Sequence, residues 1–275
     1  MATPSNIHAG PLGESTQYQD GYDATHLHPM VRAEGRAAVG LSEATVFSGE
    51  DQWTAYEFSW LDQKGKPRVA ELDITVPADS PKIVESKSMK LYLNGFSQTQ
   101  FVSEQALQST LAKDLSAGFG AEVALALRPV DQAADFSALA GLCLDELDID
   151  IDVYDYRPDF LSCTDAKPAD TQRFYSHLFR SLCPVTSQPD WATVVIECEG
   201  QALEPEGLLR YLVSYRNHQA FHETTIERVY ADIWQRCKPQ RLSVYGRFLR
   251  RGGIDINPFR SSQVGAAPRI RIPRQ

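Results

Sequence analysis

The sequence lacks several features that would each decide its class at once. No stretch approaches the roughly 20 consecutive apolar residues that cross a bilayer. There is no C-x-x-C pair, which disfavours a structural zinc knuckle, and no G-x-G-x-x-G loop or P-loop, so a Rossmann-type nucleotide site is not indicated. Basic residues are also few: 27 Lys and Arg stand against 36 Asp and Glu, a net charge of −9. A protein that reads the phosphates of duplex nucleic acid is therefore not expected.

The cysteines and the first residues indicate the compartment. Residues 1–17 contain no basic stretch followed by an apolar one, so a secretory signal is not expected. The five cysteines are odd in number and widely spaced: Cys143, Cys163, Cys183, Cys198 and Cys237. We therefore expect a reduced chain in the cytoplasm rather than a disulfide framework.

The 275 residues are 43% hydrophobic and 23% charged, which is an ordinary globular composition. Residues 1–45 have no sustained apolar period and are expected to form an arm packed on a folded body. Alternating residues predict strands at 52–60 and 69–76, joined by a turn at Lys64-Gly65-Lys66-Pro67, and another strand at 122–127. A helix is expected between a Ser103 cap and Gly118–Gly120. The alternation over 148–154, the cleanest in the chain, predicts one more strand.

The second half repeats this order of elements without repeating the sequence. Strands are expected at 192–198 and 242–248, with a turn at Gly252-Gly253 into 254–256, and two amphipathic helices lie between them. We therefore predict an α+β protein with two antiparallel sheets, each covered by helices on one face. The predicted units are an arm (1–45), a first module (46–158) and a second module (159–275).

Cys183 and Asp190 stand at the two ends of a stiff segment that contains Pro184 and Pro189. The prolines keep the segment out of a helix, so the thiol and the carboxyl are expected to face one pocket. A thiolate there is a nucleophile and the carboxyl an acid or base. The alternative is that Cys183 is a small buried hydrophobe. We assign the other four cysteines to packing.

His222 and Glu223 fall at the expected start of a helix. A carboxylate there accepts two N–H donors from the edge of a 2-amino-pyrimidin-4-one ring, one from the ring and one from the exocyclic amine. Glu223 would equally serve as an ordinary first-turn acid that complements the helix dipole. His218 and His222 are discounted as a metal pair, because the residues between them predict a break.

Three further charged segments are candidates for binding sites. The run from Glu85 to Tyr92 contains two lysines and two serines that suit phosphates or a nicotinamide, or it is a solvated helix face. Arg250 and Arg251, followed by two glycines, suit a phosphate approached closely by the backbone, or form a basic surface turn. Asp148, Asp150 and Asp152 share one face of the predicted strand. Their carboxylates could bind a cation, but a face exposed to solvent on an edge strand is the favoured interpretation.

Four separated motifs resemble one family, the QueF family of NADPH-dependent 7-cyano-7-deazaguanine reductases. They are Glu85-Ser86-Lys87-Ser88-Met89-Lys90-Leu91-Tyr92, the segment from Cys183 to Asp190, Phe221-His222-Glu223, and the run from Arg250 to Pro258. The resemblance extends from about residue 20 to the end of the sequence. In length and in its two halves, the chain is similar to the long, two-module form of the family. It implies two tandem tunnelling-fold modules, NADPH as co-substrate, no metal, and a homodimer. It also implies reduction of the nitrile of 7-cyano-7-deazaguanine to an aminomethyl group, on the route to the tRNA base queuosine.

The resemblance also implies roles for single residues. The catalytic residues it implies are Cys183 as nucleophile, Asp190 as proton donor, and His222. The residues it implies for binding the base are Glu85, Ser86, Lys87, His222 and Glu223. Those it implies for binding NADPH are Lys87, Ser88, Arg251 and Gly252. Three alternatives are kept: a zinc-dependent cyclohydrolase of the same fold, a non-catalytic purine- or tRNA-binding module, and a hydrolytic nitrilase that uses the same cysteine.

Overall fold

The computed structural model describes residues 21–41, 47–132, 136–166, 168 and 170–275. Parts of the predicted arm, residues 1–20 and 42–45, lie outside the described residues. The described part of the arm contains a short 3₁₀ helix, η1 (Ala24–His26), a strand, β1 (Pro29–Val31), and a helix, α1 (Arg32–Ala38). β1 pairs antiparallel with β4 (Lys82–Val84), so this part of the arm is hydrogen-bonded to the body.

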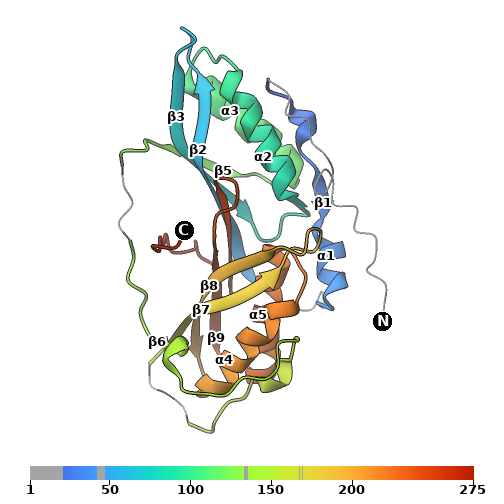
Figure 1. Ribbon diagram of the computed structural model, residues 1–275, viewed down its shortest axis with the longest axis vertical. Coiled ribbons are helices and arrows are strands. Elements are labelled where there is room, and N and C mark those ends of the chain that lie inside the picture. The colour runs from blue at the N-terminus through green and yellow to red at the C-terminus, as the bar shows by residue number, and fades with distance from the viewer. Residues whose placement is uncertain (1–20, 42–46, 133–135, 167, 169) are drawn as a thin grey trace.

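One long sheet runs through both halves of the chain (Figure 1). Its order is β5-β3-β2-β10-β9-β8-β7-β6. The first half supplies β2 (Ser48–Leu61), β3 (Pro67–Pro77) and β5 (Ala124–Arg128), and then β6 (Leu142–Cys143) follows. The second half supplies β7 (Gln172–Leu182), β8 (Pro189–Glu199), β9 (Arg241–Phe248) and β10 (Ile254–Ser261). Neighbouring strands are antiparallel except β6 and β7, which are parallel.

The prediction of two separate sheets is wrong in this respect, although the α+β class holds. β10 pairs with β9 on one side and with β2 on the other, from Ile254 opposite Ala55 to Ser261 opposite Ser48. A strand between the halves satisfies two edges that would otherwise present unpaired N–H and C=O groups. The predicted division into modules near Asp159 stays a prediction.

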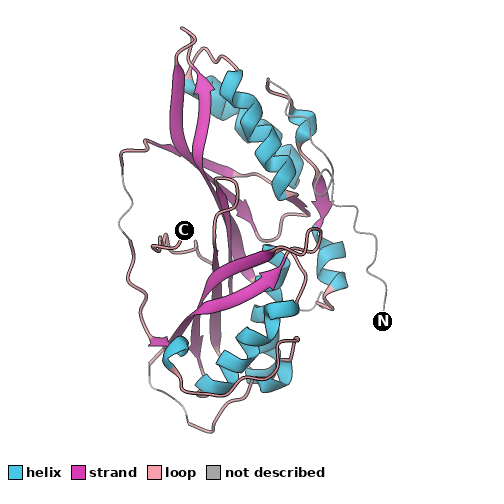
Figure 2. Cartoon of the chain, in the orientation of Figure 1, coloured by secondary structure: helices cyan, strands magenta, loops and turns pink. Residues whose placement is uncertain are grey.

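The helices lie on one face of the sheet (Figure 2). In the first half they are α2 (Ser86–Gly95), η2 (Phe96–Gln98) and α3 (Glu104–Phe119); in the second they are α4 (Pro205–Val213), η5 (Ser214–Asn217) and α5 (His222–Cys237). Each half has its own hydrophobic core between helices and sheet. As predicted, the Ser103 hydroxyl caps α3, and Gly120 ends it with a left-handed φ of 71°.

The strand predicted at 148–154 is wrong. This segment follows η3 (Leu144–Glu146), precedes η4 (Pro158–Phe160), and pairs with no strand. Its alternation is real, because Ile149 and Ile151 pack against the core of the second half while Asp148 and Asp150 are exposed. An extended chain laid over helices alternates as a strand does, so period alone did not separate the two. The long strand β7, in contrast, was not predicted.

Candidate active site

One pocket lies where the two halves meet and gathers most of the predicted site residues. The space between its lining side chains, open solvent included, is about 580 Å³. Four segments form it: β4 with the start of α2, the turn between β7 and β8, the start of α5, and the turn between β9 and β10. The side chains that carry its chemistry are Ser86, Lys90, Cys183, Asp190, His222, Glu223 and Arg251.

Cys183 directly follows β7, at the start of the turn that leads into β8. Its N–H donates to the carbonyl of Gln188 at 2.9 Å, and its own carbonyl accepts from Ser187 N–H at 3.0 Å. These two bonds close the turn, and the side chain of Cys183 is only 6% exposed. The structure brings Cys183 and Asp190 to one pocket, as the proline-bounded segment predicts.

Asp190 faces a guanidinium group and an imidazole ring in the pocket. Arg251 Nη1 lies 2.6 Å from Asp190 Oδ1, and His222 Nε2 lies 3.4 Å from the same oxygen. Burial by itself raises the pKa of Asp190, but the hydrogen bonds and charges of His222 and Arg251 outweigh it, so the pKa lies below its usual value. The His222 ring stacks on Phe248, with centroids 3.9 Å apart, which fixes its orientation. Asp190 is therefore a carboxylate in this site.

Glu223 lies in the first turn of α5 and is 3% exposed. Burial, and next the negative charge of Asp51, raise its pKa to about 7, while the charges of Arg32 and His222 act in the opposite direction. The two neighbouring acids of the pocket thus differ: Asp190 is ionised, and Glu223 titrates close to neutrality. Such a difference is typical of sites where one group carries protons and another binds a ligand.

Only part of the first motif reaches this pocket. Ser86 lines it, but Glu85 is 1% exposed and caps α2, accepting from Lys87 N–H at 2.7 Å and Ser88 N–H at 2.8 Å. Ser88 is fully buried, donates to Glu85 carbonyl at 2.7 Å and accepts from His28 N–H. The motif is thus no solvated helix face, and its helix cap fixes the direction in which α2 points its side chains.

Lys90 is one of the two lysines of the first motif, and the family resemblance assigned it no role of its own. It lines the pocket together with Ser86, four residues earlier on the same face of α2. Burial, and next the charge of Arg251, lower the pKa of Lys90. The carboxylate of Asp190 and the thiol of Cys183 act in the opposite direction, so Lys90 is within electrostatic reach of both. The helical spacing between Ser86 and Lys90 is the sequence signal that could have placed Lys90 in the pocket.

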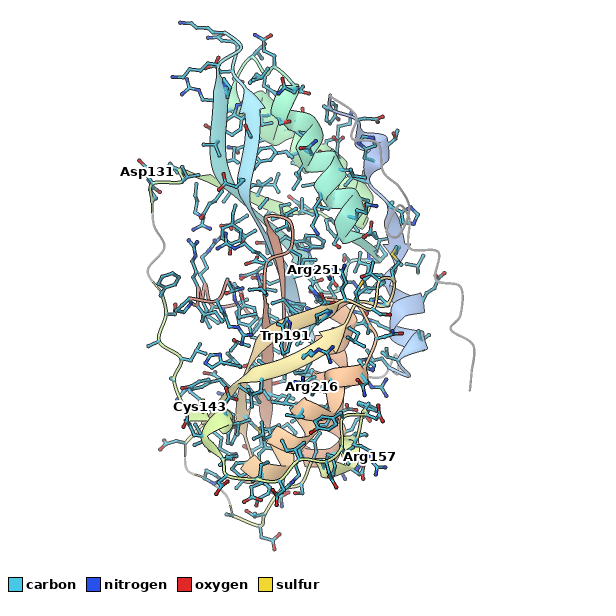
Figure 3. The ribbon with its side chains drawn as sticks, in the orientation of Figure 1. Asp131, Cys143, Arg157, Trp191, Arg216 and Arg251 are labelled. Carbon is cyan, nitrogen blue, oxygen red and sulfur yellow. The ribbon has the colours of Figure 1, made fainter. Side chains whose placement is uncertain are left out.

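The turn between β9 and β10 completes the mouth of the pocket. Figure 3 shows Arg251 at the junction of the halves. Its Nη2 donates to the side chain of Gln188, so Arg251 ties the turn after Cys183 to Asp190. Gly252 follows with φ 63°, and a side chain there would meet Lys90 Cδ at 3.3 Å. Arg250 points elsewhere: it lies over the Tyr56 ring and donates to the carbonyl of Gln275.

Comparison with known proteins decides the family. The family model described as "Nitrile reductase, 7-cyano-7-deazaguanine-reductase N-term" matches residues 18–127, and a second, "QueF-like protein", matches 189–266. The chain is 45% identical over 273 residues to the NADPH-dependent 7-cyano-7-deazaguanine reductase of Desulfotalea psychrophila, which covers 98% of this chain and 99% of that one. It is 47% identical to the protein of the same name from Verminephrobacter eiseniae, with 97% and 98% covered.

The chain belongs to the QueF family. The two family models fall on the two halves of the long sheet, and the pocket described above lies between them. Cys183 precedes the second match, but the relatives' alignments span nearly the whole chain. The resemblance read from four short motifs is thus confirmed over the full length.

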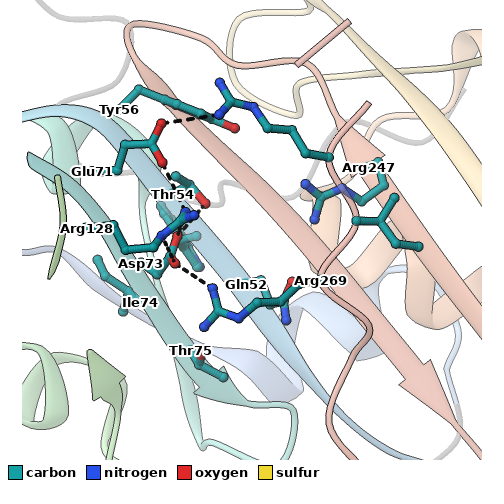
Figure 4. A pocket seen from close by; sticks show the side chains of 13 residues that line it. Gln52, Thr54, Tyr56, Glu71, Asp73, Ile74, Thr75, Arg128, Arg247 and Arg269 are labelled. Carbon is teal, nitrogen blue, oxygen red and sulfur yellow. Dashed lines mark hydrogen bonds and ion pairs between the residues drawn. The ribbon is translucent and has the colours of Figure 1, made fainter. Parts of the chain in front are cut away.

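A second pocket of this QueF chain lies on the sheet face away from the helices (Figure 4). Its charged groups are matched with one another: Arg128 pairs with Glu71 at 3.1 Å and with Asp73 at 2.9 Å, and Arg269 pairs with Asp73 at 2.6 Å. These pairs hold residues near the end of the chain against β3. We assign this pocket to structure, because its carboxylates are already ion-paired with its guanidinium groups.

Over the residues that the structure describes, no group of three or more His, Cys, Asp or Glu side chains is arranged to hold a metal ion. Among the same residues, no helix is long and apolar enough to cross a membrane. The expected absence of a metal, the cytoplasmic location and the homodimer stay predictions.

Proposed function

We propose that the Cys183 pocket carries out the NADPH-dependent reduction of 7-cyano-7-deazaguanine to 7-aminomethyl-7-deazaguanine. One observation supports this most: a cysteine, an ionised aspartate and a buried glutamate line one pocket in a chain nearly half identical to reductases of that name. As the family resemblance implies, the product leads to the tRNA base queuosine.

The first step is addition of the Cys183 thiol to the nitrile. Because Asp190 is a carboxylate before the substrate binds, it first takes the thiol proton rather than giving one of its own. The sulfur then forms a bond to the nitrile carbon, and Asp190 passes the proton to the nitrile nitrogen. The product is a covalent thioimide, which accepts electrons more readily than a nitrile. The role of proton donor predicted for Asp190 is thus preceded by a role as base.

Four electrons separate a nitrile from an amine, so we propose that two NADPH molecules react in each turnover. NADPH, when bound, supplies a hydride in each of two reductions. After the first, the sulfur–carbon bond breaks, Cys183 leaves as thiolate, and an imine remains; the second gives the amine. We assign a later proton transfer to His222, whose Nε2 faces Asp190 and whose ring is fixed by Phe248. The buried pocket keeps water from the imine.

The residues at the mouth fit an anionic dinucleotide. Lys90 and Arg251 place two cations at one edge of the pocket, and Gly252 leaves the backbone open to close approach. Arg251 has five N–H donors, and Asp190 and Gln188 engage its two Nη atoms in this structure. The resemblance adds Lys87 and Ser88 to this group, although Ser88 is buried in the helix cap.

The reaction is tested by mixing the protein with NADPH and 7-cyano-7-deazaguanine and following the absorbance of the reduced nicotinamide. We expect two NADPH consumed for each base converted, with no ammonia released. Release of ammonia without NADPH oxidation would instead support the hydrolytic nitrilase. If neither occurs, zinc content and base binding distinguish the cyclohydrolase from the binding module. Light scattering of the same preparation tests the predicted homodimer.

Replacing Glu223 by glutamine is expected to raise the KM for the base about 100-fold with a smaller effect on kcat. The amide keeps the size of the side chain but offers one oxygen where the carboxylate accepts two N–H donors, and charge-assisted hydrogen bonds are the stronger ones. Steady-state kinetics with base varied at saturating NADPH measure the effect. Glu206, an exposed acid on α4, gives the control Glu206→Gln. An unchanged KM for the base would remove Glu223 from base binding.

Replacing Lys90 by alanine is expected to raise the KM for NADPH about tenfold, because one of the two cations at the mouth is lost. The family resemblance extends the same expectation to Lys87→Ala. The control is Lys113→Ala, which removes an exposed lysine from α3. Initial rates with NADPH varied at saturating base provide the measurement. A variant Lys90→Ala whose KM for NADPH matches that of the control would exclude Lys90 from the cofactor site.

A further inference from the structure

The described part of the N-terminal arm is built into the wall behind the pocket. β1 pairs with β4, and Ile83 and Val84 of β4 line the pocket. At the end of β1 the chain turns into α1, and its first residue, Arg32, is 2% exposed. Arg32 N–H donates to the carbonyl of Pro81 at 3.0 Å, which holds α1 to the segment before β4. An arginine buried this deeply needs charged partners.

Those partners form a buried network of five charged side chains from four elements. Arg32 Nη2 lies 2.9 Å from Asp51 of β2, and Arg36 Nε lies 2.8 Å from Glu227 of α5. Arg260 of β10 reaches both acids, at 2.8 Å each. Asp51, Glu227 and Arg260 are at most 1% exposed. Three cations thus face two anions, so the network has an excess of positive charge.

Glu223 lies one helical turn before Glu227, on the same face of α5. α1 packs directly on this turn: a Cβ at Gly35 would stand 3.2 Å from the Thr224 hydroxyl, so only glycine allows the present approach without a shift. The charges that act on Glu223 come from Arg32 on α1, Asp51 on β2 and its neighbour His222. Asp190, Lys90 and Cys183 line the same pocket.

We propose that Arg32 is a positioning residue for the base-binding site: from the arm, it keeps Glu223 a carboxylate facing the pocket, and Asp51 opposes it. The inference rests on the proposed role of Glu223 and adds to it the arm, to which the sequence assigned only packing. A protonated Glu223 would present an O–H where the base presents N–H donors, so the arm sets how well the base is bound near neutral pH.

Removing the charge of Arg32 and removing that of Asp51 are expected to shift the pH dependence of kcat/KM in opposite directions. Since Glu223 titrates near pH 7 in the free protein, kcat/KM for the base is expected to fall as the pH drops below about 7. Arg32→Gln removes a positive charge, so the fall should move to higher pH by about one unit, and kcat/KM at pH 6 should drop about tenfold. Asp51→Asn removes a negative charge, so the fall should move to lower pH.

The experiment measures kcat/KM for the base between pH 5 and 9 in the two variants, in Glu223→Gln and in Arg173→Gln. Arg173 is a half-exposed arginine paired with Glu197, so its loss controls for removing an arginine elsewhere. Shifts of opposite sign support the inference, because simple destabilisation would weaken both variants. Shifts of the same sign, or none, overturn it. If Glu223→Gln keeps both its base KM and the acid fall, the proposed role of Glu223 itself fails.

A second pair of variants tests the inference if the buried charges prove necessary for folding, since removing one partner of a buried ion pair is strongly destabilising. Gly35→Ala leaves every charge in place and pushes α1 away from Thr224. We expect the KM for the base to rise several-fold while the KM for NADPH is unchanged. Gly265→Ala, where nothing lies within 4 Å of the new methyl group, is the control. Equal base KM values for the two variants would overturn the inference.

Discussion

Replacing Cys183 by alanine is expected to abolish turnover, with kcat at least about 10⁴-fold below that of the unchanged protein. The reason is chemical: without the thiol no thioimide forms, and the nitrile itself is a poor acceptor of electrons. The base should still bind, because Glu223 and the walls of the pocket are intact. Two measurements check this expectation, NADPH oxidation in the steady state and the mass of the protein after incubation with the base alone.

The mass measurement separates the nucleophile from a merely structural cysteine. The unchanged protein should gain the mass of one base, and Cys183→Ala should gain none. Cys143→Ala is the matched control, because Cys143 is a half-buried cysteine at the end of β6 and does not line the pocket. It should form the adduct and consume NADPH normally. Turnover by Cys183→Ala above one per cent of the control would contradict the proposed mechanism.

The elements of the fold were predictable where local patterns and tertiary packing agree. The hairpin at 52–76, the capped helix after Ser103 and the amphipathic helix expected to start at His222 all follow from local patterns, and the structure has each of them. The joining of the halves was not predictable, because nothing local in 254–261 shows that this strand pairs on both sides. Every residue of β10 is buried, and its sequence has no pattern from which this burial could be predicted.

Some residues of the site were predictable from the sequence and others were not. Cys183, Asp190, His222 and Glu223 reach one pocket, and for these the sequence carried both the chemistry and a stiff or helix-starting context. Glu85 and Ser88 lie instead in a helix cap, because the hydrogen bonds of a helix start compete for the same polar groups that a ligand would use. Arg32 was not predictable, since its partners Asp51 and Glu227 are distant in the sequence and meet only through the sheet.

Replacing Asp190 by asparagine is expected to lower kcat about 10³-fold while the KM for the base changes little. Asparagine keeps an oxygen that accepts from Arg251, so the turn after Cys183 should stay in place. It cannot take up the thiol proton and pass it on, however, so the transfer from sulfur to nitrogen is lost; positioned proton transfer contributes about 10²–10⁴-fold. A drop in kcat without a rise in KM identifies a group that acts in the reaction rather than in binding.

A single-turnover experiment without NADPH shows where the loss arises. The rate at which the adduct forms should fall by about the same factor as kcat, because adduct formation is the step that moves the thiol proton. Asp232→Asn provides the control, since Asp232 is an acid of the same half that binds the hydroxyls of Tyr156 and Tyr211 and does not line the pocket. Adduct formation at the unchanged rate in Asp190→Asn would confine Asp190 to a later step. Because the pKa of Asp190 lies below its usual value, its titration should add no second fall to the pH profile of the unchanged protein above pH 5.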